Sequence, residues 1–316
     1  MRRALFLYNP VSGSRHDSRL QRVTAAAEVF RAAGVESVLE PMAAPGTATT
    51  QAMAAADAGY DTVIACGGDG SVHEVLQGLV NRTTAIGVLP LGTGNAMAND
   101  LGLPRDPARA ARMLLAAKSR ALLLPRIDFA QPTGRITDHS RYFILGAGMG
   151  ADAHMAYRMT VALKGRWGMN AYYTEAWRQW LTYPYPLFEI EFQDGDRRRR
   201  EQVSEVLAIR VEWMGGFLRR LAPGASLERN DLRLVLMKSR RRWPYLRYVT
   251  GLQFNRAWLG KEIELVYATE FTCRPISDSQ DVYAEADGEL LAKLPVTIRM
   301  TDATVNLLVP QKGVGL

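Results

Sequence analysis

Short apolar runs alternate with helical patterns along the first 120 or so residues of the chain. The runs have the length of single buried strands and lie at 4–8, 35–39, 62–66 and 85–89. Apolar residues recur at helical spacing over 18–33 and 47–58, and Asp106 followed by Pro107 predicts the start of a third helix that runs to Lys118. This repeated strand–helix pattern predicts a doubly wound, mostly parallel sheet with helices on both faces.

The pattern changes after about Pro125. Longer runs predict strands of an antiparallel layer at 187–192, 204–213, 232–238, 262–273 and 296–309. A helical insert rich in Tyr and Trp is expected at 170–183. We therefore expect an α/β domain over 1–124, a β-rich domain over 125–300 and a C-terminal segment, 301–316, that returns to the first domain.

Two glycine-rich turns follow predicted strands of the first domain. They are Gly67-Gly68-Asp69-Gly70-Ser71 and Leu91-Gly92-Thr93-Gly94-Asn95, and a third candidate turn is Asn9-Pro10-Val11-Ser12-Gly13. A strand, a glycine turn and a helix N-terminus in succession direct backbone N–H groups and a positive dipole end toward one point, where phosphate oxygens can bind. One such turn is more often a tight connection only, but three within a hundred residues favour a phosphate site.

The helices after these turns have predicted caps. Ser71 and Glu74 have the spacing of a capping box, and Thr93 or Asn95 is the expected cap of a short helix that ends at Leu101. His73 would then lie in the first helical turn and, without a ligand, face solvent.

These three turns, with their order and spacing, resemble the diacylglycerol kinase catalytic-domain family, which includes sphingosine, ceramide and bacterial lipid kinases. The similarity continues through Gly146–Ala153, the segment that begins at Gly215-Gly216, and Asp287-Gly288-Glu289, so it covers nearly the whole chain. It implies an N-terminal domain like those of phosphofructokinases and NAD kinases and a C-terminal antiparallel β-sandwich-like domain with a helical insert. The active site is expected in the cleft between them, outside the carboxyl ends of the parallel strands.

The resemblance also implies which residues act. The expected ATP contacts are Asn9, Gly13, Gly67, Gly68, Asp69, Gly70, Ser71, Val72, His73, Gly92, Thr93 and Asn95. Glu289 is expected to be the catalytic base and Asp69 a catalytic acid on the side of Mg²⁺, although Asp69 could also accept the proton of the lipid hydroxyl.

The expected metal site on the second domain departs from the pattern of the family. Arg229 stands where bacterial members typically carry an aspartate that helps to hold a structural Mg²⁺. A guanidinium disfavours a bound divalent ion, so this site is either missing or rearranged around Asp231 or Glu228.

Composition and charge indicate in which compartment the protein is expected and what kind of surface it is expected to bind. The chain is 47% hydrophobic, carries a net charge of +7 and has only two cysteines, Cys66 and Cys273, which argues against a disulfide framework and suits a reducing cytoplasm. Because no apolar run approaches the length of a membrane span, we expect a cytoplasmic protein that associates peripherally with an anionic membrane surface. Cys66 is expected to be a small core residue.

Two basic segments are candidates for that surface. The segment Arg240–Tyr248 mixes arginines with aromatic residues, as a membrane-surface segment does, but a solvated basic helix explains it equally well, and Pro244 interrupts any long amphipathic helix. The run Arg197–Arg200 follows the hairpin signal Asp194-Gly195 and is expected to be a solvated turn.

The sequence therefore predicts an ATP- and Mg²⁺-dependent kinase that phosphorylates a membrane lipid, with diacylglycerol converted to phosphatidic acid as the first expectation. A sphingosine-, ceramide- or phosphatidylglycerol-type kinase, a soluble-substrate kinase and a catalytically silent nucleotide- or lipid-binding protein are the alternatives. A nucleic-acid partner rests on charge alone and is not expected. Association of two copies of the chain is left open.

Overall fold

The computed structural model describes residues 1–10, 19–133, 138–154, 178, 181–195, 197–214, 220–254, 259–277 and 280–311. The chain divides into two compact units, Met1–Leu124 with Asp302–Leu316, and Pro125–Thr301. Two strands, β5 (Lys118–Phe129) and β16 (Val296–Val309), contribute residues to both units.

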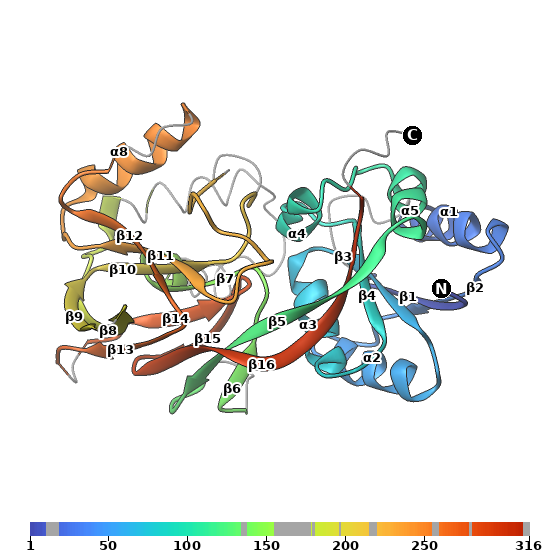
Figure 1. Ribbon diagram of the computed structural model, residues 1–316, viewed down its shortest axis with the longest axis horizontal. Helices are drawn as coiled ribbons and strands as arrows, with labels where there is room; N and C mark the ends of the chain where they lie inside the picture. Colours follow the sequence, from blue (N-terminus) through green and yellow to red (C-terminus); the bar gives the residue numbers. More distant parts are fainter. Residues whose placement is uncertain are drawn as a thin grey trace. The chain divides into compact units, whose positions relative to one another are not determined.

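The first unit contains a parallel sheet in the strand order β2, β1, β3, β4 and the C-terminal end of β16 (Figure 1). The first four strands are β1 (Arg3–Tyr8), β2 (Glu36–Pro41), β3 (Thr62–Gly67) and β4 (Ala85–Pro90). Every residue of β3 and β4 is buried, as expected for central strands covered on both faces. The predicted α/β class, strands and parallel order are confirmed.

The helices of this unit lie between the strands in sequence. They are α1 (Arg19–Ala32), α2 (Ala48–Asp57), α3 (Asp69–Leu79), α4 (Ala96–Asp100) and α5 (Pro107–Leu115). Phe30 of α1 meets Phe6 of β1 edge to face, with ring centroids 5.1 Å apart, which joins that helix to the sheet.

Helix α5 begins as predicted and ends early. The Asp106 carboxylate accepts a hydrogen bond of 2.7 Å from the amide of Arg109, and Pro107 occupies the first turn. The helix ends at Leu115, because Lys118 already belongs to strand β5, which the apolar pattern did not reveal.

The second unit is built from two layers of strands. One sheet has the order β12, β11, β10, β7, β14, β15, with antiparallel neighbours. Its strands are β7 (Gly146–Gly150), β10 (Glu205–Ile209), β11 (Leu232–Met237), β12 (Ile263–Ala268), β14 (Tyr283–Ala286) and β15 (Glu289–Lys293).

The other layer pairs strands of the same unit with the first part of β16. Its order is β16, β13, β8, β9, and β5 pairs with the short β6. These strands are β6 (Ser140–Tyr142), β8 (Phe188–Asp194), β9 (Arg197–Val203) and β13 (Glu270–Pro275). Buried residues from both layers, such as Met149, Leu234, Phe188 and Phe271, form one hydrophobic core.

Three predictions for this unit need correction. The run 262–273 is two strands, β12 and β13, in different layers. Arg197–Arg200 lies in strand β9 rather than in a turn, because Arg197 already pairs with Asp194 of β8, and Gly195 lies in the turn between them with φ near +58°. Pro244 does not interrupt a helix: α8 (Arg242–Gln253) has it in the first turn, where no intrahelical N–H is needed. The expected insert at 170–183 falls mostly outside the described residues.

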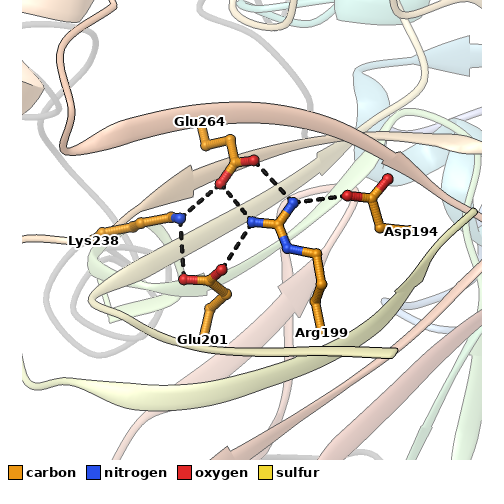
Figure 2. Close-up of polar contacts among 5 residues, drawn as sticks. All are labelled: Asp194, Arg199, Glu201, Lys238 and Glu264. Atoms are coloured by element: carbon orange, nitrogen blue, oxygen red, sulfur yellow. Dashed lines mark hydrogen bonds and ion pairs between the residues drawn. The ribbon is translucent and has the colours of Figure 1, made fainter. Parts of the chain in front are cut away.

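A network of charged side chains joins the two layers at one edge of the second unit. Figure 2 shows Arg199 of β9 in its middle, with hydrogen bonds to both carboxylate oxygens of Glu264 on β12, at 3.0 and 2.9 Å. Lys238, just after β11, contacts Glu264 at 2.6 Å and Glu201 at 3.0 Å. Because β9 and β12 belong to different layers, these contacts tie the layers together where strand hydrogen bonds do not.

Candidate functional site

The two glycine turns that follow β3 and β4, and Asn9 just after β1, lie together in the first unit. The amide of Asn9 donates to the carbonyl of Cys66 at 3.1 Å, and the amides of Leu91 and Gly92 donate to the carbonyl of Gly67 at 2.9 and 3.2 Å. The carboxyl ends of parallel strands lie at one edge of a sheet, so the turns are brought together by the strand order itself. Gly13 of the third turn lies outside the described residues.

The first two glycine turns touch backbone to backbone. A Cβ on Gly92 would lie 2.5 Å from the Cα of Gly68, and one on Gly67 would lie 2.6 Å from the Cβ of Ser71. Distances below 3.0 Å are not tolerated between such atoms. Glycine is therefore required at both positions by close approach, and the two turns form one packed element.

Asp69 links α3 to α4. It is the first residue of α3, and its two carboxylate oxygens accept hydrogen bonds from the amides of Ala96 and Met97, at 3.0 and 3.1 Å. Neither Thr93 nor Asn95 caps α4 with its side chain. Asn95 adopts a left-handed conformation with φ near +54°, and its side chain forms hydrogen bonds with the backbone of Gly92 instead. Thr93 is exposed. Asp69, 27 residues before Ala96, supplies the cap, which local sequence spacing could not reveal.

The start of α3 corrects the predicted capping box. The helix begins at Asp69, two residues before Ser71, and Ser71, Val72 and His73 are all buried. His73 is only 2% exposed, so it does not face solvent. The Glu74 carboxylate accepts from the amides of Gly46 and Ala48, at 3.0 and 3.3 Å, and so caps α2 instead of its own helix.

This arrangement can bind phosphate groups through backbone amides. The amides of Ser71 and Val72 donate to the carbonyl of Gly68, at 3.0 and 3.2 Å, and the N-terminus of α3 carries the positive end of the helix dipole. A Cβ on Gly70, in the same turn, would meet no atom within 4 Å, so the backbone is open to close approach at that position. The geometry fits a polyphosphate bound along the backbone, whereas the buried side chains of Val72 and His73 are packing residues of α3.

In the second unit, the Asp-Gly-Glu motif forms the turn between β14 and β15. Asp287 is 8% exposed, with φ near +51°, and its carboxylate accepts hydrogen bonds from the amides of Ile144, Leu145 and Gly146. Glu289, the first residue of β15, is exposed. The motif therefore has one residue that holds the backbone and one that presents a carboxylate to its surroundings.

Arg210 is a further charged group buried in this unit. Its guanidinium donates to the carbonyls of Leu227 and Arg229, at 3.1 and 3.3 Å. Burial lowers the pKa of Arg210 to about 10, against the opposing effects of Asp287 and Asp231. Arg210 thus fixes the loop that carries Arg229.

Three carboxyl groups lie near the glycines of β7, Asp152 and Glu285 at Gly148 and Glu205 at Gly150, and Glu205 and Glu285 lie outside the motifs of the sequence. A Cβ on Gly148 would lie 2.8 Å from an oxygen of Asp152 and 2.9 Å from one of Glu285. Glu205 accepts from the amides of Ala151 and Asp152. Burial raises the pKa of Asp152 to about 6, and burial together with the nearby Asp152 raises the pKa values of Glu205 and Glu285 well above their usual range. Near neutral pH this cluster can retain protons.

The predicted metal site on the second unit is occupied by an ion pair. The Nε and Nη2 atoms of Arg229 donate to the two oxygens of Asp231, both at 2.6 Å. The same guanidinium lies over the ring of Tyr267, 4.0 Å from its centroid, and Arg233 lies 4.2 Å from the same centroid. Among the described residues, no group of three acidic, His or Cys side chains is placed to hold a metal ion. Asp231 therefore does not fit a Mg²⁺ site.

The two cysteines are buried in their cores, as expected for Cys66. Burial raises the pKa of the Cys66 thiol well above its usual range and also raises that of Cys273. Neither is a nucleophile near neutral pH.

The chain combines an α/β unit, which has packed glycine turns after its parallel strands, with a β-sandwich-like unit that carries buried and exposed carboxyls. A family model for the diacylglycerol kinase catalytic domain matches residues 3–126, and one for the YegS C-terminal NAD kinase beta sandwich-like domain matches residues 146–309. The chain belongs to the diacylglycerol kinase family and is a lipid kinase.

Individual relatives agree with this assignment. The chain is 31% identical over 302 residues to a diacylglycerol kinase of Bacillus subtilis strain 168, which covers 93% of this chain and 92% of the relative. It is 26% identical to a diacylglycerol kinase of Staphylococcus aureus strain MRSA252, with 98% and 93% of the two chains covered. A crystal structure of a diacylglycerol kinase from Bacillus anthracis strain Sterne superposes with a TM-score of 0.69 at 16% identity, covering 99% of this chain and 98% of that one. At that identity the structure supports the fold alone.

Proposed function

We propose that this lipid kinase is ATP-dependent and transfers the γ-phosphate to the hydroxyl of diacylglycerol, giving phosphatidic acid. The observation that carries the proposal is the packed pair of glycine turns, in which Gly92 lies against Gly68 and Asp69 holds the start of α4. Such an element presents rigid backbone amides, and rigid donors suit the β- and γ-phosphates of a nucleotide better than a mobile loop does. The names of the relatives point to diacylglycerol as the acceptor.

The nucleotide would bind through the backbone of the three turns. The proposed contacts are Asn9, Gly13, Gly67, Gly68, Asp69, Gly70, Ser71, Val72, His73, Gly92, Thr93 and Asn95. For Ser71, Val72 and His73 the contact would be made by the backbone or by packing beneath it, because their side chains are buried. Exposed Thr93 is the side chain of this set best suited to reach the nucleotide.

Mg²⁺ would bind beside Asp69 and neutralise charge on the transferred phosphate. Carboxylates are the side chains that usually hold Mg²⁺ in phosphate-transferring enzymes, and Asp69 lies at the start of α3, in the turn proposed to hold the phosphates. The contact with α4 also orients the carboxylate. We do not extend the proposal to Asp231, because both of its oxygens bind Arg229.

Glu289 is the proposed base for the lipid hydroxyl. Its position is supported by the turn before it, because three amides anchor Asp287 and so fix the start of β15. An exposed carboxylate at a fixed position can receive a hydroxyl proton from a substrate that approaches from outside. The first unit would bind the nucleotide and the second the lipid.

We also propose that the protein works in the cytoplasm at the surface of a membrane. None of the described helices is long and apolar enough to cross a bilayer. The net charge of +7 favours approach to anionic lipid. Pairing of two copies is a separate expectation that light scattering tests.

The decisive experiment offers labelled ATP and Mg²⁺ together with vesicles of diacylglycerol, ceramide, sphingosine or phosphatidylglycerol. The label is expected on diacylglycerol. If another lipid is labelled, that lipid and not diacylglycerol is the substrate. If ATP binds but no lipid is labelled, the result favours a catalytically silent binding protein. Glu289→Gln is expected to lower transfer by at least a hundredfold. Glu270→Gln, also an exposed glutamate at the start of a strand, is the matched control and should retain activity.

A further inference from the structure

Helix α8 carries an exposed stripe of aromatic and basic residues on the second unit. Trp243, Arg247, Thr250 and Phe254 follow one another at spacings of four, three and four, which places them on one side of a helix. Trp243 is 70% exposed and Phe254 66% exposed. Aromatic side chains such as Trp243 and Phe254 are among the residue types that insert into a membrane interface.

The opposite side of α8 fixes the helix to the body of the second unit. Tyr248, Val249 and Leu252 are buried, and the hydroxyl of Tyr248 donates to the carbonyl of Leu221 at 2.6 Å. Helix α8 also packs against β12. The helix that carries the exposed stripe is therefore fixed to the second unit by its other side. The stripe itself does not need to be buried for the fold to form.

A cavity of about 550 Å³ opens beside the first half of the stripe. It is lined by Arg241, Trp243, Pro244, Leu246, Arg247, Thr250 and Glu262. A Cβ on Gly260 would lie next to the Arg247 guanidinium and the Glu262 carboxylate, so these two cavity-lining side chains lie close to the same point of the chain.

Positive charge dominates this surface. Arg240, Arg241, Arg242 and Arg247 stand on or next to the first half of α8, and Glu262 is the acidic group that lines the cavity. Four cations around one anion leave an excess that attracts anionic groups at a range of about 10 Å in physiological salt. Tryptophan and arginine together are the residue types that lie at the boundary between lipid headgroups and acyl chains.

We propose that the α8 surface, made of Arg240–Trp243, Arg247, Thr250 and Phe254, docks the second unit on an anionic lipid bilayer. Trp243 and Phe254 enter the headgroup region, and the arginines contact lipid phosphates, one of which fits the cavity beside Arg241 and Arg247. This rests on the proposed function, because a kinase acting on a membrane lipid must meet its substrate at a bilayer. A soluble acidic partner would satisfy the charge but would leave the need for two exposed aromatic residues unexplained.

Vesicle sedimentation without ATP tests docking independently of catalysis. We expect binding to vesicles of phosphatidylglycerol and phosphatidylcholine, and none to pure phosphatidylcholine. The double variant Arg241→Glu with Arg242→Glu should lower the partition coefficient by at least about 25-fold, because each arginine near an anionic surface contributes about fivefold. Trp243→Ala should lower it by about tenfold. The matched control, Arg2→Glu with Arg197→Glu, changes the same charge at exposed positions elsewhere and should bind like the wild type.

A second readout separates docking from the kinase reaction. Phosphorylation of a dispersed short-chain diacylglycerol needs no bilayer, so the α8 variants are expected to lose activity on vesicles but not on the dispersed substrate. Equal vesicle binding by the α8 variants and the wild type would overturn the docking proposal, whatever lipid is phosphorylated. Vesicle binding that needs α8, in a protein that phosphorylates no lipid, would retain docking and overturn the proposed function.

Discussion

Gly92 packs directly on Gly68, so that a Cβ on Gly92 would stand 2.5 Å from the Cα of its neighbour. Each glycine belongs to a different strand–turn–helix segment, and the amide of Gly92 also bonds the carbonyl of Gly67. The proposed nucleotide site is therefore one rigid element in which either turn positions the other.

Replacing Gly92 tests that coupling. Gly92→Ala forces the two turns apart, and we expect it to lower the free energy of unfolding by about 1–3 kcal/mol and to weaken ATP binding. Thermal unfolding without nucleotide and nucleotide titration measure the two effects. Gly70→Ala is the control for stability, because a Cβ there meets no atom within 4 Å and an alanine suits the helix. Equal stability of the Gly92 variant and the wild type would show that the close contact is not required.

Asp69 is expected to serve both the fold and the reaction. Asp69→Ala removes both acceptors of the α4 amides and should destabilise the protein by about 0.5–2 kcal/mol, whereas Asp69→Asn keeps one acceptor and should lose less. Both variants are expected to abolish phosphate transfer. Asp106→Ala removes a similar cap from α5 and should lose stability while it retains activity. If the asparagine variant transfers phosphate as fast as the wild type, Asp69 has only a structural role.

The Arg199–Glu264 pair should make the second unit sensitive to acid. Hydrogen bonds from Arg199 and Lys238 lower the pKa of Glu264 from 4.5 to about 2. A carboxyl with a lowered pKa stabilises the folded state above its unfolded value of about 4.5. That stabilisation is lost as the pH falls from there to about 2.

Unfolding of Glu264→Gln across that pH range is the measurement. We expect a loss of about 1 kcal/mol at pH 7, since the network is partly exposed to solvent, and no difference from the wild type near pH 2. Glu36→Gln breaks an exposed pair with Arg3 and should cost less than about 0.5 kcal/mol. A loss that persists unchanged at pH 2 would contradict an electrostatic origin.

The carboxyl cluster around Gly148 should have the opposite dependence on pH. Burial raises the pKa of Asp152 from 3.8 to about 6, so its contribution to stability is fully present below about 3.8 and is lost as the pH rises through 6. Asp152→Asn removes a carboxyl that must ionise beside Glu285. It is expected to raise the free energy of unfolding at pH 8 by about 1–3 kcal/mol and to have little effect at pH 4. Asp281→Asn, at an exposed position, is the control. If the Asp152 variant is less stable than the wild type at pH 8, the prediction is wrong.

Removal of divalent ions should leave the second unit unchanged. Because Arg229 binds both oxygens of Asp231, we expect dialysis against EDTA to leave the thermal unfolding temperature as it was. Differential scanning calorimetry with and without Mg²⁺ makes the comparison. A rise in unfolding temperature with Mg²⁺ that disappears in Asp231→Asn would mean that the ion displaces Arg229.

Local patterns predicted β1 to β4 and the beginnings of α1, α2 and α5 to within one or two residues, but not β5. They were less successful where the partner of a segment lies far along the chain. β9 carries four arginines in succession and was expected to be a turn, since strand pairing with β8 and the contacts of Arg199 are not visible in its own sequence. The boundary between β12 and β13 was missed because a single residue, Thr269, separates them and no glycine or proline marks the turn.

The candidate site divides in the same way. The sequence alone determined the two glycine turns after β3 and β4 and the turn at Asp-Gly-Glu, because glycine at a close approach and acidic residues in turns are local requirements that spacing reveals. Only the tertiary structure decided that Asp69 caps α4 and that Glu74 caps α2. It also decided that His73 is buried and that Arg229 forms an ion pair with Asp231. Except for the neighbours Arg229 and Asp231, each is set by which segments the sheet order brings together. A side chain's partner depends on packing in three dimensions, which short-range spacing does not encode.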